Sequence, residues 1–523
     1  MLMFLVFLAS CLCHCYGKTV YYQPEQIHLS YGDDPTSMLV AWSTMSSVPS
    51  SIVEYGVAEY GVAYFNMSAN GSQKEFIDGG SEHHTQYIHT VSVTGLIPGQ
   101  KYVYHCGSSL GWSSRYSFTA MRQGNNWSPR IVMFGDMGNV NAQSLPRLQT
   151  EVEEGMYDAV FHIGKHLYDN ANVGDEFMRQ IEPIAANVPY MTCPGNHETR
   201  YNFSNYKNRF AMPGDLNGEN MFYSFDIGPA HVISFSSEFY FALEYGYMQP
   251  VRQYEWLERD LKIATSAAKK AVTPWIITLA HRPMYCSNTD HDDCTKKDSI
   301  VRTGVLHLLG LENLFYKYGV DLMLWAHEHT YERLWPVFNK QVYNGTSSPY
   351  VNPGAPVHII TGSAGCQEDH DGFKTDPAKW SAFRSTDYGY TRMNILNSTH
   401  IYMEQVSDDK NGTIIDRIMM RFTASEVIQR ILGDSYESSD EDVGSSDDDI
   451  LPNDDEIVSE QEENEPEMQS DTDDGGSDDS FGRAAGYGIT LNIPHDIHTE
   501  VVGDMQREPV ENIERQIAQQ ERG

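Results

Sequence analysis

Short stretches in which apolar and polar residues alternate fill the first part of the chain. Five of them, separated by turn residues, have the pattern of β-strands: 37–44, 51–57, 87–93, 101–108 and 115–120. Alternation places one face of each strand against a core, and this spacing is typical of a small antiparallel β-sandwich. We therefore predict a sandwich domain over residues 18–122. Because no catalytic cluster falls within it, we expect a role in packing or recognition.

The pattern changes after Asn126, where apolar strands begin to alternate with stretches of helical periodicity. Seven apolar runs have the composition of buried strands: 130–136, 158–164, 188–195, 231–238, 274–281, 320–327 and 357–365. Three segments between them place apolar residues at helical spacing: 175–186, 253–264 and 304–319. Alternating strands and helices indicate a layered α/β domain, which we place at residues 128–422.

The end of the chain, residues 433–523, is rich in charge and poor in aromatic residues. The whole chain carries 36 Lys and Arg against 72 Asp and Glu, a formal net charge of −36. Residues 434–480 hold 21 acidic residues and no Lys or Arg, which is over half of that excess. This composition predicts a disordered acidic tail, with a cation-binding or partner-binding segment as the alternative. A sequence pI near 4.8 excludes nucleic-acid binding through a global positive field.

Residues 1–17 form a short apolar stretch that ends in small and polar residues, as a secretory signal peptide does. The stretch carries no basic residue at its start, and a buried helix or a membrane anchor is the alternative. No later segment has 18 consecutive apolar residues, so we predict no transmembrane segment. We expect a secreted protein, or alternatively a lysosomal one.

Sequons for N-glycosylation support a secretory route. There are seven, and none lies in the acidic tail: they begin at Asn66, Asn70, Asn126, Asn202, Asn344, Asn397 and Asn411. They predict a glycoprotein with these asparagines at its surface.

The cysteines agree with an oxidising compartment. Removal of the signal peptide leaves five: Cys106, Cys193, Cys286, Cys294 and Cys366. Cys286 and Cys294 are close enough in sequence to close a small disulfide loop, and the odd count leaves at least one thiol unpaired. The chain has no Cys-x-x-Cys pair that would indicate zinc or redox chemistry.

Polar side chains follow five of the predicted strands of the second domain. They are Asp136, the segment 165–168, Asn196 with His197, His281, and His327 with His329. In open α/β sheets, sites form at the carboxyl ends of strands. Carboxylate, phenolate, amide and imidazole groups are ligands for iron, zinc or manganese. Two such metals side by side clamp the oxygens of a phosphoryl group and activate water, which is the chemistry of phosphoester hydrolysis.

Five short blocks carry a resemblance to a known family. In chain order they are GDMG at 135–138, GKHLY at 164–168, GNHE at 195–198, TLAH at 278–281 and AHEH at 326–329. This series resembles the signature of the purple acid phosphatases, specifically the animal high-molecular-weight type, and it covers about residues 20–422. The resemblance implies a fold class of α+β/α/β. A fibronectin type III-like sandwich at 18–122 would precede an αββα calcineurin-like metallophosphoesterase domain at 128–422.

The family resemblance implies a first metal, Fe(III), bound by Asp136, Tyr168 and His329. The bond between this iron and the tyrosinate gives the family its purple colour. The implied activity is that of an acid phosphatase, in which a metal-bound hydroxide attacks a phosphate monoester.

A second, divalent metal is implied at Asn196, His281 and His327, and it would be iron, zinc or manganese. His197 would contact the substrate phosphate or protonate the leaving group. His291 has the approximate position of a further substrate contact in some relatives. The alternative for His291 is a solvated loop histidine between acidic neighbours.

One position departs from the family pattern. The second block in the family reads G-D-x-x-Y, with an Asp that bridges the two metals, and here Lys165 stands in its place. Exchanging a carboxylate for an ammonium changes the local charge by two units. At 4 Å each like-charge unit costs about 4 kcal/mol with an effective dielectric of 20, so a charged Lys165 requires rearrangement beside two metals.

Several outcomes of this exchange are open. Lys165 can lose its proton and act as a neutral ligand, or swing out while His166 or Asp169 partly substitutes. Alternatively one metal site is lost, which would leave a metal-impaired pseudophosphatase that acts as a binding or surface protein. Ala326, where the family usually has Gly, is a smaller departure. We predict an enzyme, a secreted acid phosphatase for small phosphate monoesters or other phosphorylated substrates.

Overall fold

The computed structural model describes residues 21–59, 62–81, 83–164, 171–214, 219–289 and 291–432. The predicted signal peptide and the predicted acidic tail lie outside these residues. So do Lys165, His166, Tyr168 and Asp169. Within the described part, no helix is both long enough and apolar enough to span a bilayer.

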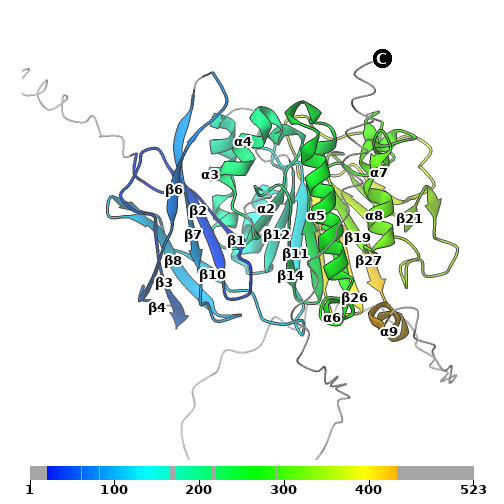
Figure 1. Cartoon of the computed structure of the whole chain (residues 1–523), viewed down its shortest axis with the longest axis horizontal. Coiled ribbons are helices and arrows are strands. Elements are labelled where there is room, and N and C mark those ends of the chain that lie inside the picture. Colours follow the sequence, from blue (N-terminus) through cyan, green and yellow to red (C-terminus); the bar gives the residue numbers. More distant parts are fainter. Residues whose placement is uncertain are drawn as a thin grey trace, which may run out of the picture. The chain divides into compact units, whose positions relative to one another are not determined.

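Two antiparallel sheets form the N-terminal part of the molecule (Figure 1). The first has the order β1-β2-β7-β6 and consists of β1 (Glu25–Tyr31), β2 (Met38–Thr44), β7 (Thr85–Val93) and β6 (Ser72–Ile77). The second consists of β10 (Tyr116–Thr119), β8 (Lys101–Ser108), β3 (Ile52–Glu59), β4 (Val62–Ala63), β5 (Met67–Asn70) and β9 (Gly111–Trp112). Trp42, Tyr102 and Tyr104 are buried in the core. The predicted β-sandwich is confirmed.

A six-stranded sheet forms the first central layer of the second domain, in the order β13-β12-β11-β25-β26-β27. Its strands are β11 (Arg130–Gly135), β12 (Ala159–Ile163), β13 (Tyr190–Cys193), β25 (Gly389–Ile395), β26 (His400–Ser407) and β27 (Thr413–Arg421). The strands β11 to β13 are parallel, as the apolar runs with intervening helices predict. The strands β25 to β27 are antiparallel, and β25 pairs with β11.

A seven-stranded sheet forms the second central layer, in the order β14-β15-β16-β19-β23-β20-β24. Its strands are β14 (Tyr223–Ile227), β15 (Ala230–Ser234), β16 (Trp275–Leu279), β19 (Leu322–Trp325), β23 (Val357–Thr361), β20 (Tyr331–Leu334) and β24 (Ser381–Ser385). Two short hairpins extend this half of the domain: β17 (Gly304–Val305) with β18 (Leu308–Leu309), and β21 (Val337–Phe338) with β22 (Gln341–Val342).

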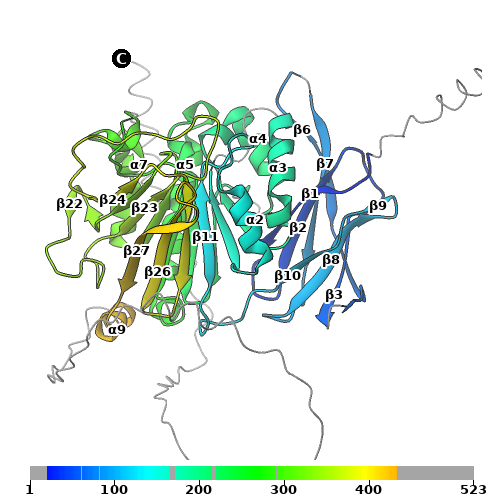
Figure 2. The same cartoon turned by 180° about the vertical axis from the view of Figure 1, so that it is seen from behind.

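Helices cover the outer face of each sheet, so the layers follow the order αββα (Figures 1 and 2). The helices are α2 (Leu145–Glu153), α3 (Ala171–Ala185), α4 (Arg200–Arg209), α5 (Met248–Ala264), α6 (Ala267–Lys270), α7 (Ile300–Thr303), α8 (Leu311–Lys317) and α9 (Ala424–Leu432). Along β16, Ile277 belongs to the core between the sheets, whereas Ile276 belongs to the core beneath α5 and α8. Both faces of this strand are buried, which explains its continuous apolar sequence.

One predicted helix is wrong in its first half. The segment 304–319 has apolar residues at helical spacing, but only α8 within it is helical. The turn between β17 and β18 has positive φ at Leu306 and His307, 53° and 63°. Gly304 has φ of 86°, and a Cβ there would lie 1.8 Å from the Leu308 carbonyl oxygen. The chain therefore forms a closely paired hairpin here, although the apolar spacing alone would favour a helix.

Helix α3 joins the sandwich to the second domain. Glu182 on α3 accepts hydrogen bonds from the backbone N–H groups of Gln26, at 2.6 Å, and Ile27, at 3.2 Å, both on β1. Its other carboxylate oxygen accepts from the Tyr116 hydroxyl on β10. Arg209 and Asp175 form an ion pair of 2.6 Å at the same boundary, with both side chains buried. The sandwich is thus attached through a helix whose sheet carries the candidate site.

Candidate metal centre

Four strands from the two central sheets end close to one another and deliver most of the predicted ligands. Asp136 directly follows β11, and Asn196 begins a 3-10 turn, η1 (Asn196–Glu198), after β13. His281 follows β16 by two residues, and His327 follows β19 by two. The structure brings these four side chains together although 191 positions separate the first from the last. Lys165 and Tyr168, which follow β12, lie outside the described residues and stay predictions.

The three side chains predicted to bind the divalent metal lie close together. Asn196 Oδ1 lies 2.9 Å from His281 Nε2, and His327 Nδ1 lies 3.2 Å from the same nitrogen. The His281 and His327 rings meet edge to face, with centroids 4.9 Å apart. Such an arrangement points one oxygen and two ring nitrogens at a shared space.

The other ring nitrogens of the two histidines contact polar groups outside the shared space. His281 Nδ1 lies 3.1 Å from the Ile163 carbonyl oxygen and donates to it, which turns Nε2 toward Asn196 and His327. His327 Nε2 is hydrogen-bonded to the Asp292 carboxylate and also lies 2.8 Å from Arg282 Nη1, so its Nδ1 faces the shared space. One amide oxygen and two imidazole nitrogens thus face one another at 2.9 to 3.2 Å. This donor set fits a divalent metal such as zinc or iron.

The residues predicted for the first metal lie beside this group. Asp136 is fully buried, and its Oδ1 is 3.7 Å from His329 Nε2 and 3.9 Å from His281 Nε2. Its Oδ2 accepts the backbone N–H of His327 at 2.6 Å. Carboxylate and imidazole side chains are ligand types that iron uses in proteins. Asp136 and His329 therefore fit the first metal.

A loop after β23 sets the orientation of His329. The ring Nδ1 donates to the Asp369 carbonyl oxygen at 2.8 Å, which turns Nε2 toward Asp136. The His329 backbone N–H donates to Asp371 Oδ2 at 2.6 Å. The buried Cys366 Sγ lies 3.6 Å from His329 Nδ1. Sequence reasoning missed Asp369 and Asp371 because nothing local relates this loop to a histidine 40 residues earlier.

His197 and His291 occupy different positions around the centre. His197 follows Asn196 on η1, its side chain is 23 % exposed, and its Nε2 is 3.7 Å from Glu368 Oε1. His291 is exposed on the loop after β16, with φ of 65°. Ala326, the smaller departure from the family pattern, is buried against Gly135, where an added Cβ would lie 2.2 Å from the Ala326 Cβ. The methyl group at 326 fits because the facing residue has no side chain.

Family models match three consecutive parts of the chain. The model described as "Purple acid Phosphatase, N-terminal domain" matches residues 24–120, and "Calcineurin-like phosphoesterase" matches 129–331. The model "Iron/zinc purple acid phosphatase-like protein C" matches 355–417. "Acid phosphatase type 7" of Danio rerio is 55% identical over 421 residues, which are 78% of this chain and 94% of the relative. The human protein of that name is 56% identical over 402 residues, 76% of this chain and 90% of the relative.

The chain belongs to the purple acid phosphatase family. A solved structure of a purple acid phosphatase from yellow lupin (Lupinus luteus) seeds superposes with a TM-score of 0.66 at 25% identity, covering 78% of this chain and 76% of that one. The resemblance and the fold class predicted from the sequence are confirmed. Membership agrees with the position of the predicted ligands at the ends of strands from both central sheets.

Three further residues at the centre of this family member escaped sequence reasoning. Asp292 Oδ2 accepts from His327 Nε2 and from Arg282 Nη1, the latter at 2.8 Å. Arg282 also donates through Nε to the buried Glu238 at 3.0 Å. Burial raises the pKa of Asp292, but the hydrogen bond and charge of His327, together with Arg282, outweigh burial and hold that pKa well below its usual range. The position of Arg282, directly after a ligand histidine, was the one available signal.

Proposed function

We propose that this protein is a secreted acid phosphatase that hydrolyses phosphate monoesters at two metal ions. The observation that carries the proposal is the convergence of Asn196, His281 and His327 beside the buried Asp136. The same ligand types in the same order define the family that the chain belongs to. When bound, two metals supply Lewis-acid polarisation of the phosphoryl group and activation of water. Fe(III) with a divalent iron, zinc or manganese ion is the pair that we propose, with Tyr168 completing the Fe(III) ligands.

His197 is the residue that we propose to act on the substrate directly. It lies on η1, whose geometry is fixed by Glu198, because the buried Glu198 carboxylate accepts the Gly195 N–H at 2.7 Å. A partly exposed imidazole next to the ligand Asn196 can contact a phosphate oxygen or deliver a proton to the leaving oxygen. His291 lies on an exposed loop, and a contact with substrate is its proposed role.

Lys165 supports a second candidate, a metal-impaired pseudophosphatase. The lysine stands where the family's bridging Asp belongs, and its positive charge opposes the binding of two adjacent cations. Six other ligand positions, three for each metal, keep the residue types that the family uses. Their retention favours an enzyme over a binding protein.

Metal content and a single reversion separate these two candidates. The proposed enzyme holds close to two metals per chain and releases phosphate from a generic monoester such as p-nitrophenyl phosphate at acidic pH. If the wild-type protein instead holds under one metal and is inert, while Lys165→Asp gains both metals and activity, the chain is a pseudophosphatase. If the wild-type protein is active and Lys165→Asp has the same metal content, Lys165 does not occupy the bridging position.

Export to the secretory pathway is proposed on three grounds. The first 17 residues have signal-peptide character, and a disulfide joins Cys286 to Cys294, which is typical of an oxidising compartment. Six sequon asparagines are exposed, and Asn202 is partly buried in α4. In a secreting cell line we expect a mature N-terminus near residue 18 and a mass decrease on enzymatic removal of N-glycans. An unprocessed N-terminus and no mass change would contradict export.

A further inference from the structure

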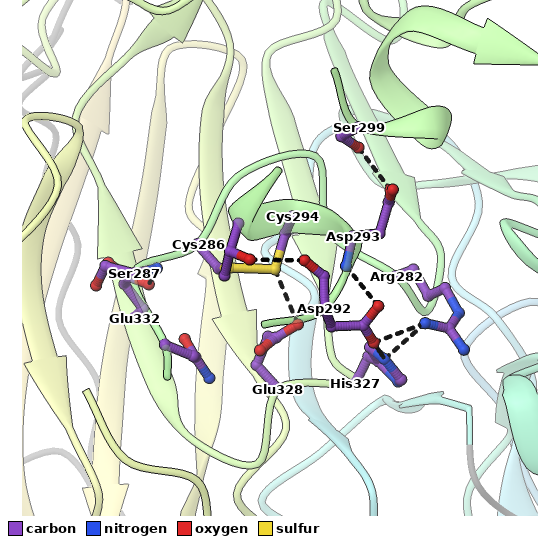
Figure 3. The surroundings of a disulfide bond; sticks show 12 residues. Arg282, Cys286, Ser287, Asp292, Asp293, Cys294, Ser299, His327, Glu328 and Glu332 are labelled. Atoms are coloured by element: carbon purple, nitrogen blue, oxygen red, sulfur yellow. Dashed lines mark hydrogen bonds and ion pairs between the residues drawn. A yellow bond between two sulfur atoms is a disulfide. The ribbon is translucent and has the colours of Figure 1, made fainter. Parts of the chain in front are cut away.

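A nine-residue disulfide loop lies beside the proposed divalent metal site. Cys286 and Cys294 are bonded, with Cα atoms 5.4 Å apart, and both are buried. The loop leaves β16 just after the ligand His281 and ends in the 3-10 turn η5 (Asp293–Thr295). Asp292, two residues before the bridge closes, reaches back to His327 (Figure 3).

Asp292 and Arg282 form a chain of charged groups that ends on His327. The Asp292 carboxylate accepts from both His327 Nε2 and Arg282 Nη1, and Arg282 Nη1 is itself 2.8 Å from His327 Nε2. The guanidinium is held from behind by Glu238, whose side chain is 1 % exposed, and lies over the Phe241 ring at 4.4 Å. Arg282 therefore cannot easily move away from the histidine, whatever occupies position 292.

Asp292 offers His327 Nε2 a hydrogen-bond acceptor, whereas Arg282 offers the same nitrogen only donors. In the tautomer that donates from Nε2 to the carboxylate, Nδ1 offers its lone pair toward Asn196 and His281. Without the carboxylate, the trapped guanidinium faces Nε2 with N–H donors only, which favours the tautomer that has its proton on Nδ1. That proton would point at His281 Nε2, 3.2 Å away, where the metal is proposed to lie.

The disulfide holds the loop that places Asp292. On one side of the bridge, Cys294 Sγ lies 2.9 Å from Oε1 of the buried Glu328, the residue between the two ligands His327 and His329. On the other side, the Cys286 carbonyl accepts from Trp380 Nε1 at 3.1 Å. The neighbouring Asp293 points away from the centre and accepts from the Ser299 hydroxyl at 2.7 Å (Figure 3). Closure by a covalent bond reduces the number of conformations that the loop can adopt.

We propose that Asp292, held by the Cys286–Cys294 disulfide, is a positioning residue that keeps His327 in the tautomer and orientation needed to bind the divalent metal. The inference rests on the proposed metal centre and adds residues that lie outside its ligand set. Carboxylate partners of metal-binding histidines typically contribute 10- to 100-fold to metal affinity. The disulfide acts on His327 only through Asp292, so its removal weakens the binding of the same ion by less.

The test measures the affinity of metal-free, full-length protein for Zn²⁺ by calorimetry with a competing chelator. Asp292→Ala is expected to weaken one of two bound ions by about 10- to 100-fold, and Asp292→Glu to recover part of the loss. The double variant Cys286→Ser/Cys294→Ser is expected to weaken the same ion by less. Asp298→Asn is the matched control, because it removes one charge from an exposed carboxylate that pairs with Arg302 rather than with His327, and it should bind like the wild type.

The outcomes distinguish this inference from the proposed function. Equal Zn²⁺ affinity in Asp292→Ala and wild type overturns the positioning role and leaves the phosphatase proposal intact. A loss shared equally by both ions, together with a lower melting temperature that Asp292→Glu does not rescue, also overturns it, because it indicates a purely structural role. Wild-type protein that binds both ions with the expected Asp292 dependence but hydrolyses no monoester supports the positioning role and contradicts the phosphatase.

Discussion

Two glycines leave room for the predicted metal ligands His281 and Asp136. Gly164 has φ of 77°, and a Cβ built on it would lie 2.2 Å from His281 Nδ1. Gly362 faces Asp136 in the same way, with an ideal Cβ 2.8 Å from Oδ2 and 2.2 Å from the Glu328 carbonyl oxygen. Side chains at these positions would displace a ligand, so the absence of a side chain is part of the site.

Gly164→Ala should therefore weaken metal binding in addition to destabilising the backbone. A positive φ penalises any L-residue by about 1 to 2 kcal/mol, and here the new methyl group also pushes the His281 ring away from Asn196. The matched control is Gly155→Ala, since Gly155 has φ of 72° and an ideal Cβ there has no neighbour within 4 Å. We expect comparable backbone penalties, with metal content lost in Gly164→Ala alone. Full metal content in Gly164→Ala would contradict the close approach of the His281 ring to this glycine.

His358 on β23 is a buried histidine that makes the fold sensitive to acid. It accepts from Trp325 Nε1 at 3.0 Å, and burial lowers its pKa to about 3. The unfolded chain, with a pKa near 6.5, takes up a proton first as the pH falls. The stability that neutral His358 provides above pH 6.5 is thus lost progressively toward pH 3.

His358→Gln should flatten this acid response. By linkage, protonation of the unfolded chain costs the wild type about 2 to 3 kcal/mol between pH 7 and 4.5, and glutamine cannot take up that proton. Urea unfolding gives the free energy of unfolding at each of the two pH values. Its decrease on acidification should be about 2 to 3 kcal/mol smaller in the variant, even if glutamine weakens packing at both pH values. An identical pH dependence in the two proteins would contradict the prediction.

At the scale of elements, helix α3 connects the sandwich to the sheet that carries Asp136. Its Glu182 satisfies two backbone N–H groups of β1 and the Tyr116 hydroxyl of β10. Gln26 has a positive φ of 62° at this contact, beside an irregularity in the pairing of β1 with β2. The irregular strand leaves backbone donors that only a side chain from another domain can accept.

Glu182→Ala should weaken the attachment of the sandwich to the second domain and leave metal binding unchanged. It leaves two part-buried N–H groups without this acceptor, at a cost of about 2 to 4 kcal/mol. Arg179→Ala is the control one turn earlier, because Arg179 also reaches β1, at Glu25, but through a side chain that is 48% exposed. Such a surface pair contributes at most about 1 kcal/mol. Melting curves and limited proteolysis compare the two, and equal destabilisation would contradict the role of Glu182.

At the scale of the whole molecule, the proposed metals connect the two central sheets. Asp136 and Asn196 come from the sheet of β11 and β13, whereas His281 and His327 come from the sheet of β16 and β19. Ions bound between them stabilise only the folded state, in which both sheets are in place.

Removal of the metals should therefore lower the melting temperature of the whole second domain. A ligand at 100 times its Kd adds about 2.7 kcal/mol, so chelation should lower the transition by several degrees and added Zn²⁺ should restore it. His281→Ala provides the control, since its transition should respond far less to chelator or to zinc. A wild-type transition that is indifferent to both treatments would contradict metal binding between the sheets.

Much of the architecture was predictable because it depends on local periodicity. Alternation in β2 and β7, continuous apolar runs in β11 and β16, and the amphipathic α5 each reflect burial that neighbouring residues share. The candidate ligands could be found because their chemical types follow strand ends in a fixed order. The same reasoning wrongly predicted a helix over residues 304–310, because apolar spacing alone does not distinguish a helix from a hairpin closed by positive φ values.

The sequence by itself determined the fold class, the family and the residue types at the ends of the central strands, because each is written in short segments. Only the tertiary structure decided which atoms of those residues face one another. It placed Asp292 beside His327, Asp369 beside His329, and β25 beside β11. These contacts join segments that are 35 to more than 200 residues apart, and chain separation of that size leaves no local pattern from which a partner can be read.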